Sequence, residues 1–160
     1  MAHEESIKQE LVTKFSFLTD KINIKRERRI FAETPSDNFY DVFGYTVKMM
    51  KFTYLCTITG LDEGDNLSFI YHLAKTDGTT LSLKTSVPKA HPVIRTITEY
   101  FPGGVFYERE LVDLLGAKVE GLPEGNRYPL TDDWPQGQHP LRKDWKSEML
   151  DQAKKPVGGE

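Results

Sequence analysis

Three consecutive segments between residues 52 and 87 have the pattern of half-buried β-strands, and this pattern constrains the fold most. Residues 52–59, 67–75 and 79–87 are rich in β-branched and aromatic side chains, with apolar residues alternating along the last two. Only short turns separate the segments, and one turn contains Asp77-Gly78, a dipeptide that tolerates positive φ. Because turns this short join neighbouring antiparallel strands, we predict an antiparallel meander of three strands.

Helical periodicity flanks this meander on both sides. Apolar side chains recur at helical spacing in residues 7–18 and 39–50, and Ser36 or Asp37 is placed to cap the second of these helices. After the meander, Pro92 suits the first turn of a third helix that would run to Phe101. A fourth helix would end at Gly116, the residue type most often found just past a helix.

A further strand is predicted over residues 21–31, which are rich in isoleucine and arginine. Its basic run favours a polar sheet edge protected against edge-to-edge pairing, over contact with anionic lipid or with a partner. The expected fold class is therefore α+β: an antiparallel or mixed sheet of about four strands, a usual sheet size, with helices packed on one side. Cys56 lies in the middle of a predicted strand and is expected to be buried.

The character of the chain changes after Gly116. Residues 117–160 are rich in proline and glycine and have no sustained periodicity, yet they contain Trp134, Trp145 and several leucines. Disordered tails are usually poor in large apolar residues. We therefore predict a core domain at residues 1–116 and a long irregular C-terminal arm at residues 117–160 that docks on another protein.

Composition excludes several classes of function. The net charge is -3, whereas nucleic-acid-binding domains are usually basic. The single cysteine cannot hold an iron–sulfur cluster, which needs four ligands. No apolar stretch approaches the roughly 20 residues that span a bilayer, and the N-terminus lacks the features of a secretory signal. We expect a cytoplasmic chain that reaches a membrane only through partners, with no catalytic, cofactor-binding or metal-binding residues of its own.

The densest charged cluster is Glu108, Arg109, Glu110 and Asp113, near the start of the fourth predicted helix. Glu110 and Asp113 are three residues apart, so their carboxylates share one helix face. Three interpretations remain open. The acidic residues complement the helix dipole, they bind arginines of a partner, or they form a metal or acid–base pair, the least favoured because no histidine or cysteine lies nearby in sequence.

The best candidates for docking anchors lie in the arm. Trp134, Arg142 and Trp145 are of the residue types enriched in the energetic centres of interfaces. Leu141 and Trp145 flank Arg142, Lys143 and Asp144, so this charged run is not expected to be wholly exposed.

Three segments of the chain carry a resemblance to a known family. Residues 108–116 read Glu-Arg-Glu-Leu-Val-Asp-Leu-Leu-Gly; residues 121–130 contain Gly-Leu-Pro, Asn-Arg and Leu; residues 132–145 contain Asp-Asp-Trp-Pro and His-Pro-Leu-Arg-Lys-Asp-Trp. Over residues 52–145 the sequence resembles the 30 kDa subunit family shared by respiratory NADH dehydrogenases and energy-converting nickel–iron (NiFe) hydrogenases. Where respiratory members read Gly-His-Pro-Asp and paired arginines, this chain has only Arg127. The Asp-Asp-Trp-Pro run and the short end are more similar to the hydrogenase branch.

The resemblance implies a non-catalytic subunit in the hydrophilic arm of a membrane-bound energy-converting hydrogenase, which couples ferredoxin-linked hydrogen production or uptake to ion translocation. Its partners would be the large catalytic subunit and the small iron–sulfur subunit. These would carry the NiFe centre and the iron–sulfur clusters, with no cofactor on this chain. The residues predicted to dock on them are Glu108, Arg109, Glu110, Asp113, Arg127, Trp134, His139, Arg142, Lys143, Asp144 and Trp145.

Two alternatives remain. The first is the corresponding 30 kDa subunit of a complex of the NADH-quinone oxidoreductase type. The second is a free-standing protein-binding module with no redox context. The cysteine motifs of a co-purifying large subunit would separate the first alternative from the hydrogenase assignment, and the absence of any redox partner would support the second.

Overall fold

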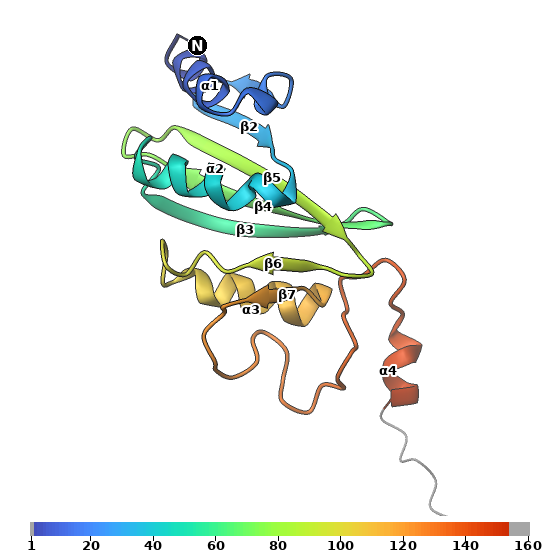
Figure 1. Ribbon diagram of the computed structural model, residues 1–160. Helices are drawn as coiled ribbons and strands as arrows, with labels where there is room; N and C mark the ends of the chain where they lie inside the picture. The colour runs from blue at the N-terminus through green and yellow to red at the C-terminus, as the bar shows by residue number, and fades with distance from the viewer. Residues whose placement is uncertain (1, 154–160) are drawn as a thin grey trace, which may run out of the picture.

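The computed structural model describes residues 2–153. In chain order its elements are α1 (Ala2–Lys14), the 3-10 helix η1 (Ser16–Leu18), β1 (Ile22–Arg26), β2 (Arg29–Glu33), α2 (Ser36–Lys48), β3 (Tyr54–Asp62), β4 (Asn66–Ala74), β5 (Thr80–Pro88), β6 (Val93–Arg95), α3 (Gly104–Leu115), β7 (Lys118–Glu120) and α4 (Ser147–Ala153). Five strands form one sheet in the order β1-β2-β5-β4-β3, and β6 and β7 form a separate parallel pair (Figure 1). The expected α+β class with a mixed sheet is confirmed.

The predicted meander is the centre of the large sheet. Strands β3, β4 and β5 pair antiparallel, and the β4–β5 turn places Gly78 at a φ of 83°. The sheet is mixed because β2 lies parallel to β5. Residues 21–31, predicted as one strand, instead contribute to the hairpin of β1 and β2, which turns at Arg28 with a φ of 58°. The imperfect alternation of isoleucine and arginine in this segment reflects that turn, and it explains why the sheet has five strands rather than about four.

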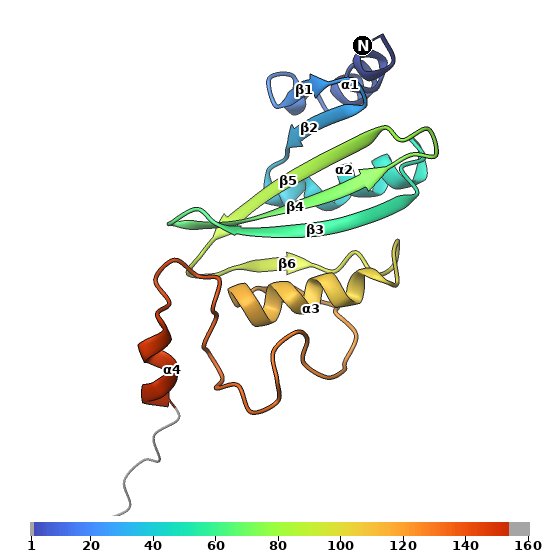
Figure 2. The ribbon, with the colours of Figure 1, turned by 180° about the vertical axis from the view of Figure 1, so that it is seen from behind.

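The core lies between this sheet and α2, which covers one face (Figure 1). Phe39 and Phe43 of α2 pack on Tyr71 of β4, with ring centroids 4.7 and 5.5 Å apart. Burying side chains of this kind stabilises a fold by roughly 1.5–3 kcal/mol each. Figure 2 shows the opposite face of the sheet, which α2 leaves uncovered. There His72 hydrogen-bonds the Thr59 and Ser82 hydroxyls, so polar cross-strand contacts replace apolar packing.

Helix α3 packs against edge strand β3. Gly60 provides the close approach, because a Cβ there would collide with the side chains of Leu111 and Leu115. Cys56 lies at an irregularity in the β3–β4 register and is exposed, so the expectation that it is buried was wrong. The irregularity interrupts the regular alternation of faces, which sequence alone does not reveal.

The predicted third helix does not form. Residues 93–95 are instead β6, which pairs parallel with the unpredicted strand β7. Ile97 and Ile94 are buried as expected, but a tertiary contact described below fixes the backbone at Ile97 in a non-helical conformation. The predicted cap of α2 was also wrong: the N-cap residue is Pro35, and no side chain caps the helix.

The boundary between the domain at 1–116 and the arm at 117–160 stays a prediction. Residues 118–120 of the predicted arm pair with β6, and the residues that follow run back past α3 toward α4 (Figures 1 and 2). The end of the predicted arm, residues 154–160, lies outside the described residues.

Candidate docking surface

The C-terminal end of α3 is capped by the chain itself. Gly116 adopts the left-handed conformation at a φ of 71°, and the N–H groups of Gly116 and Ala117 bond to the carbonyls of Val112 and Leu111. This confirms the C-cap predicted from sequence. A helix leaves its last four carbonyls without partners inside the helix, so three more, those of residues 113–115, still need donors.

Residues 139–142 supply these three donors. The ring Nδ1–H of His139 donates to the Asp113 carbonyl at 2.9 Å, and the N–H of Leu141 donates to that of Leu114 at 3.0 Å. Arg142 donates from Nε to the Leu115 carbonyl at 2.7 Å. A cation at this position also complements the negative end of the helix dipole. The His-Pro-Leu-Arg sequence therefore completes the cap of α3.

The next residues of this segment are bound at the end of β3. Asp62, whose side chain is 1% exposed, accepts from Lys89 Nζ at 2.7 Å and from the backbone N–H of Lys143 at 2.8 Å. Lys89 also reaches Asp144 at 2.8 Å. The Lys89 ammonium, aided by the N–H groups of Lys143 and Gly64, lowers the pKa of Asp62 to about 2 against the opposing effect of burial. Asp62 is therefore a charged anchor for residues 143 and 144.

Asp113, from the predicted charged cluster, binds the first half of the same segment. Its carboxylate accepts from Arg127 Nε at 3.2 Å and from the N–H of Leu130 at 3.2 Å. Arg127 in turn donates to the Trp134 carbonyl at 2.7 Å. Arg109 packs on Gly125 and donates to the carbonyls of residues 123 and 124 at 3.3 and 3.0 Å. These contacts hold residues 121–134 along α3.

Glu108 has a different role from its neighbours because it is fully buried. Its carboxylate accepts from the N–H of Ile97 at 2.8 Å and from the hydroxyl of Thr96 at 2.6 Å. Burial raises the pKa of Glu108, while these two hydrogen bonds oppose the rise. This is the contact that fixes the backbone at Ile97. A partner has no access to the carboxylate in this fold, so Glu108 supports the core.

The two tryptophans form a pair. The rings of Trp134 and Trp145 lie 6.1 Å apart between centroids, and both indole N–H groups donate to Gln138, one to its carbonyl and one to its side chain, each at 2.9 Å. Each tryptophan stays partly exposed. Both indole N–H groups therefore have hydrogen-bond partners within the chain, while part of each apolar ring surface stays exposed.

The outward surface of this region includes exposed apolar residues that the sequence did not predict to dock. Phe106 and Leu141 are each 54% exposed and Tyr128 is 46% exposed, and the rings of Phe106 and Tyr128 lie 5.6 Å apart. Lys143 and Asp144 are exposed as well, and Glu110 is half-buried. The one sequence signal for Phe106 was an aromatic residue outside the apolar stripe of the helix that ends at Gly116.

We call residues 121–145 the C-terminal segment. Of the predicted docking residues, Arg109, Asp113, Arg127, His139 and Arg142 are engaged in holding it to α3. Trp134, Lys143, Asp144, Trp145 and Glu110 keep surface that a partner can reach. The positions of these residues do not test any contact with a partner, so their role in docking stays a prediction.

Within residues 2–153, no group of three or more histidine, cysteine, aspartate or glutamate side chains could hold a metal ion. No helix in the same range is long and apolar enough to cross a membrane. The fold and the segment bound to α3 define an α+β protein that exposes the large apolar side chains of Phe106, Tyr128 and Leu141.

The sequence identifies the particular family. Residues 32–149 match the family described as respiratory-chain NADH dehydrogenase, 30 Kd subunit, and the chain belongs to this family. The resemblance seen in the sequence is therefore confirmed.

Relatives in this family are subunits of several redox complexes. The chain is 32% identical to a subunit of the F(420)H(2) dehydrogenase of Methanosarcina mazei over 88% of this chain and 90% of that protein. It is 35% identical to the membrane-bound hydrogenase subunit beta of Pyrococcus furiosus over 59% of each chain. It is 30% identical to a subunit of the NADH-quinone oxidoreductase of Moorella thermoacetica over 70% of this chain and 76% of that protein.

Solved structures agree with the fold. A chain of the membrane-bound sulfane sulfur reductase, an archaeal respiratory membrane complex, superposes with a TM-score of 0.82 over 99% of this chain and 95% of its own, at 24% identity. A trypsin-resistant fragment of Nqo5 superposes with a TM-score of 0.63 over 76% of this chain and 98% of the fragment, at 25% identity.

Proposed function

We propose that this chain is a non-catalytic subunit in the hydrophilic part of a membrane-bound redox complex, where it docks on the large catalytic subunit. The observation that carries the proposal is the C-terminal segment. One side of it is bonded to α3 and β3, while Phe106, Tyr128 and Leu141 leave large apolar side chains in water. Exposed apolar patches at an ordered surface mark interaction sites.

The docking surface we propose combines these residues with the tryptophan pair, Lys143 and Asp144. Aromatic side chains at the centre and charged residues at the rim are the usual composition of an interface. Arg142 and His139 act in this proposal as positioning residues, because their donors are already used on α3 carbonyls.

For the type of complex, we propose an energy-converting membrane-bound hydrogenase, with the NiFe centre and the iron–sulfur clusters on the large and small partner subunits. The 35% identity to a membrane-bound hydrogenase subunit and the Asp-Asp-Trp-Pro run at residues 132–135 support this. A complex of the quinone-linked or F(420)H(2)-linked type is the second candidate, because the match to the F(420)H(2) dehydrogenase subunit covers 90% of that protein.

The test is to purify the tagged full chain from its source membranes and identify the proteins that accompany it. We expect a large subunit and a small iron–sulfur subunit. Paired Cys-x-x-Cys motifs in the large subunit would support the hydrogenase, and their absence would support the second candidate. Recovery of the chain alone, or turnover or stoichiometric metal in the isolated chain, would contradict the proposal.

A further inference from the structure

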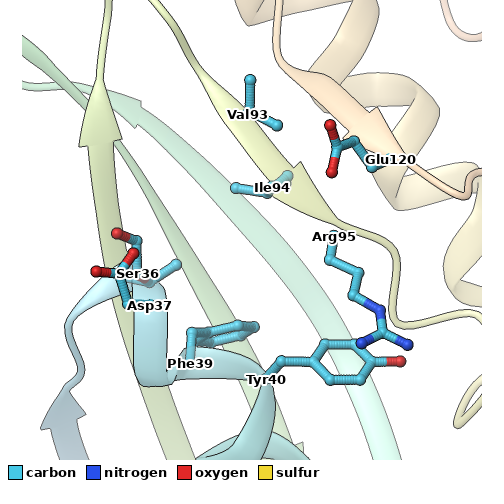
Figure 3. Close-up of a pocket in the computed structure, with 9 residues that line it drawn as sticks. Ser36, Asp37, Phe39, Tyr40, Val93, Ile94, Arg95 and Glu120 are labelled. Atoms are coloured by element: carbon cyan, nitrogen blue, oxygen red, sulfur yellow. The ribbon is translucent and has the colours of Figure 1, made fainter.

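A cavity of about 190 Å³ opens at the amino end of α2, between this helix and the strands β6 and β7 (Figure 3). None of the predicted docking residues lines it. Phe39, Val93 and Ile94 form an apolar part of its wall, while Asp37 and Glu120 contribute carboxylates.

The charge available in this cavity is negative. Arg95 also lines it, but its guanidinium carbon lies 3.8 Å from the centroid of the Tyr40 ring and its Nη2 lies 3.7 Å from Glu99. Figure 3 shows this guanidinium over Tyr40, away from Asp37. Neither Asp37 nor Glu120 has a side-chain ion pair or hydrogen bond to another side chain among residues 2–150. The amino end of α2 balances part of the charge of Asp37.

A buried hydroxyl gives a second, independent sign of a ligand. Thr85 lines the same cavity, is 2% exposed, and has no hydrogen-bond partner for its Oγ1 within the part of the chain that the structure describes. Buried polar atoms are nearly always hydrogen-bonded, and an unsatisfied one destabilises the fold. A donor that enters the cavity would remove this deficit.

We propose that the cavity binds an arginine side chain of a neighbouring subunit. A guanidinium carries five N–H donors in one plane, so it can donate to a carboxylate and to a hydroxyl oxygen at the same time. The methylene groups of the same side chain would pack on Val93 and Ile94. That this arginine belongs to a subunit of the complex rests on the proposed function. That the cavity recognises a guanidinium rests on the cavity alone.

The first experiment uses the isolated full chain and a blocked arginine, N-acetyl-arginine methylamide, followed by amide NMR. We expect saturable shifts at residues 36–40 and 93–95, and none with the equivalent citrulline compound, which has the same shape without the charge. Asp37→Asn combined with Glu120→Gln should weaken binding by about tenfold or more. Both positions are exposed, so the fold should survive. Glu5→Gln, an exposed carboxylate on α1, is the matched control and should change nothing.

An equal response to citrulline, or binding that the double substitution leaves intact, would overturn the guanidinium site. The second experiment asks whether the double variant recovers partner subunits from source membranes as well as the Glu5→Gln control does. Reduced recovery supports a partner arginine. Normal recovery would overturn the assignment to a partner even if blocked arginine binds. Failure of the unsubstituted chain to recover any subunit would overturn the proposed function and the partner assignment, and the NMR result would still decide the guanidinium site.

Discussion

Arg142 donates from Nε to the carbonyl of Leu115 at 2.7 Å, across 27 positions of sequence. This bond links the most recognisable motif of the chain to the end of α3. The sequence predicts that the motif reaches outward to a partner, whereas its arginine completes a helix cap within the chain. The consequence is that Arg142 should affect stability before it affects assembly.

Arg142→Ala should lower the free energy of unfolding by about 1–3 kcal/mol, because a partly buried carbonyl loses a charged donor. Lys143→Ala is the control, since only the backbone N–H of Lys143 binds Asp62 and its side chain is exposed. The control should stay within about 0.5 kcal/mol of the unsubstituted chain. Chemical denaturation of both variants measures the difference, and equal stabilities would refute the capping role of Arg142.

Gly116→Ala should destabilise the chain more than Gly137→Ala does. Both glycines have positive φ, 71° and 74°, so both substitutions carry a similar backbone strain of about 1 kcal/mol. At Gly116 a Cβ would also lie 2.6 Å from the His139 ring and 2.9 Å from Arg142, whereas at Gly137 nothing lies within 4 Å. The additional loss of stability in Gly116→Ala, measured by thermal or chemical denaturation, reports the contact between α3 and the C-terminal segment. Two equal losses would mean that this contact is loose in solution.

Stability should fall with acid through Asp62. Its pKa is lowered from 3.8 to about 2 in the fold, chiefly by the Lys89 ammonium. A carboxylate with a lowered folded-state pKa stabilises the protein above its unfolded value, and this contribution disappears as the pH falls through the folded value. The stability gap between the unsubstituted chain and Asp62→Asn should therefore be largest near neutral pH and shrink between about pH 4 and pH 2. A gap that does not vary with pH would argue against the lowered pKa.

Local patterns in the sequence predicted much of the fold. The alternation at residues 67–73, the Asp77-Gly78 turn and the Gly116 cap each depend on neighbouring residues, and each is observed. The prediction of the third helix failed because the backbone conformation there depends on Glu108, which binds Ile97 from 11 positions away. The hairpin at Arg28 was not predicted because positive φ is uncommon for arginine and no glycine marks the turn.

The sequence singles out residues for docking but does not predict which of their side chains bind α3. The sequence singled out Arg127, Trp134 and the motif around Arg142, and all of them lie in the C-terminal segment. Which side chains face α3 depends on long-range partners such as Asp62 and Asp113, whose positions follow from the fold. Phe106 was missed because an exposed aromatic residue on a helix resembles any other apolar residue until its burial is known.

The central claim is that the inner side of the C-terminal segment holds the fold, while its outer side and the neighbouring Phe106 of α3 dock on a partner. The most direct measurement compares Phe106→Ala combined with Leu141→Ala against the exposed-residue control Met49→Ala, which is 65% exposed elsewhere on the surface. For the double variant we predict melting close to that of the unsubstituted chain and recovery of the large subunit reduced by about tenfold or more, since truncated anchors typically cost about 2 kcal/mol each. Recovery equal to that of the Met49→Ala control would contradict the claim.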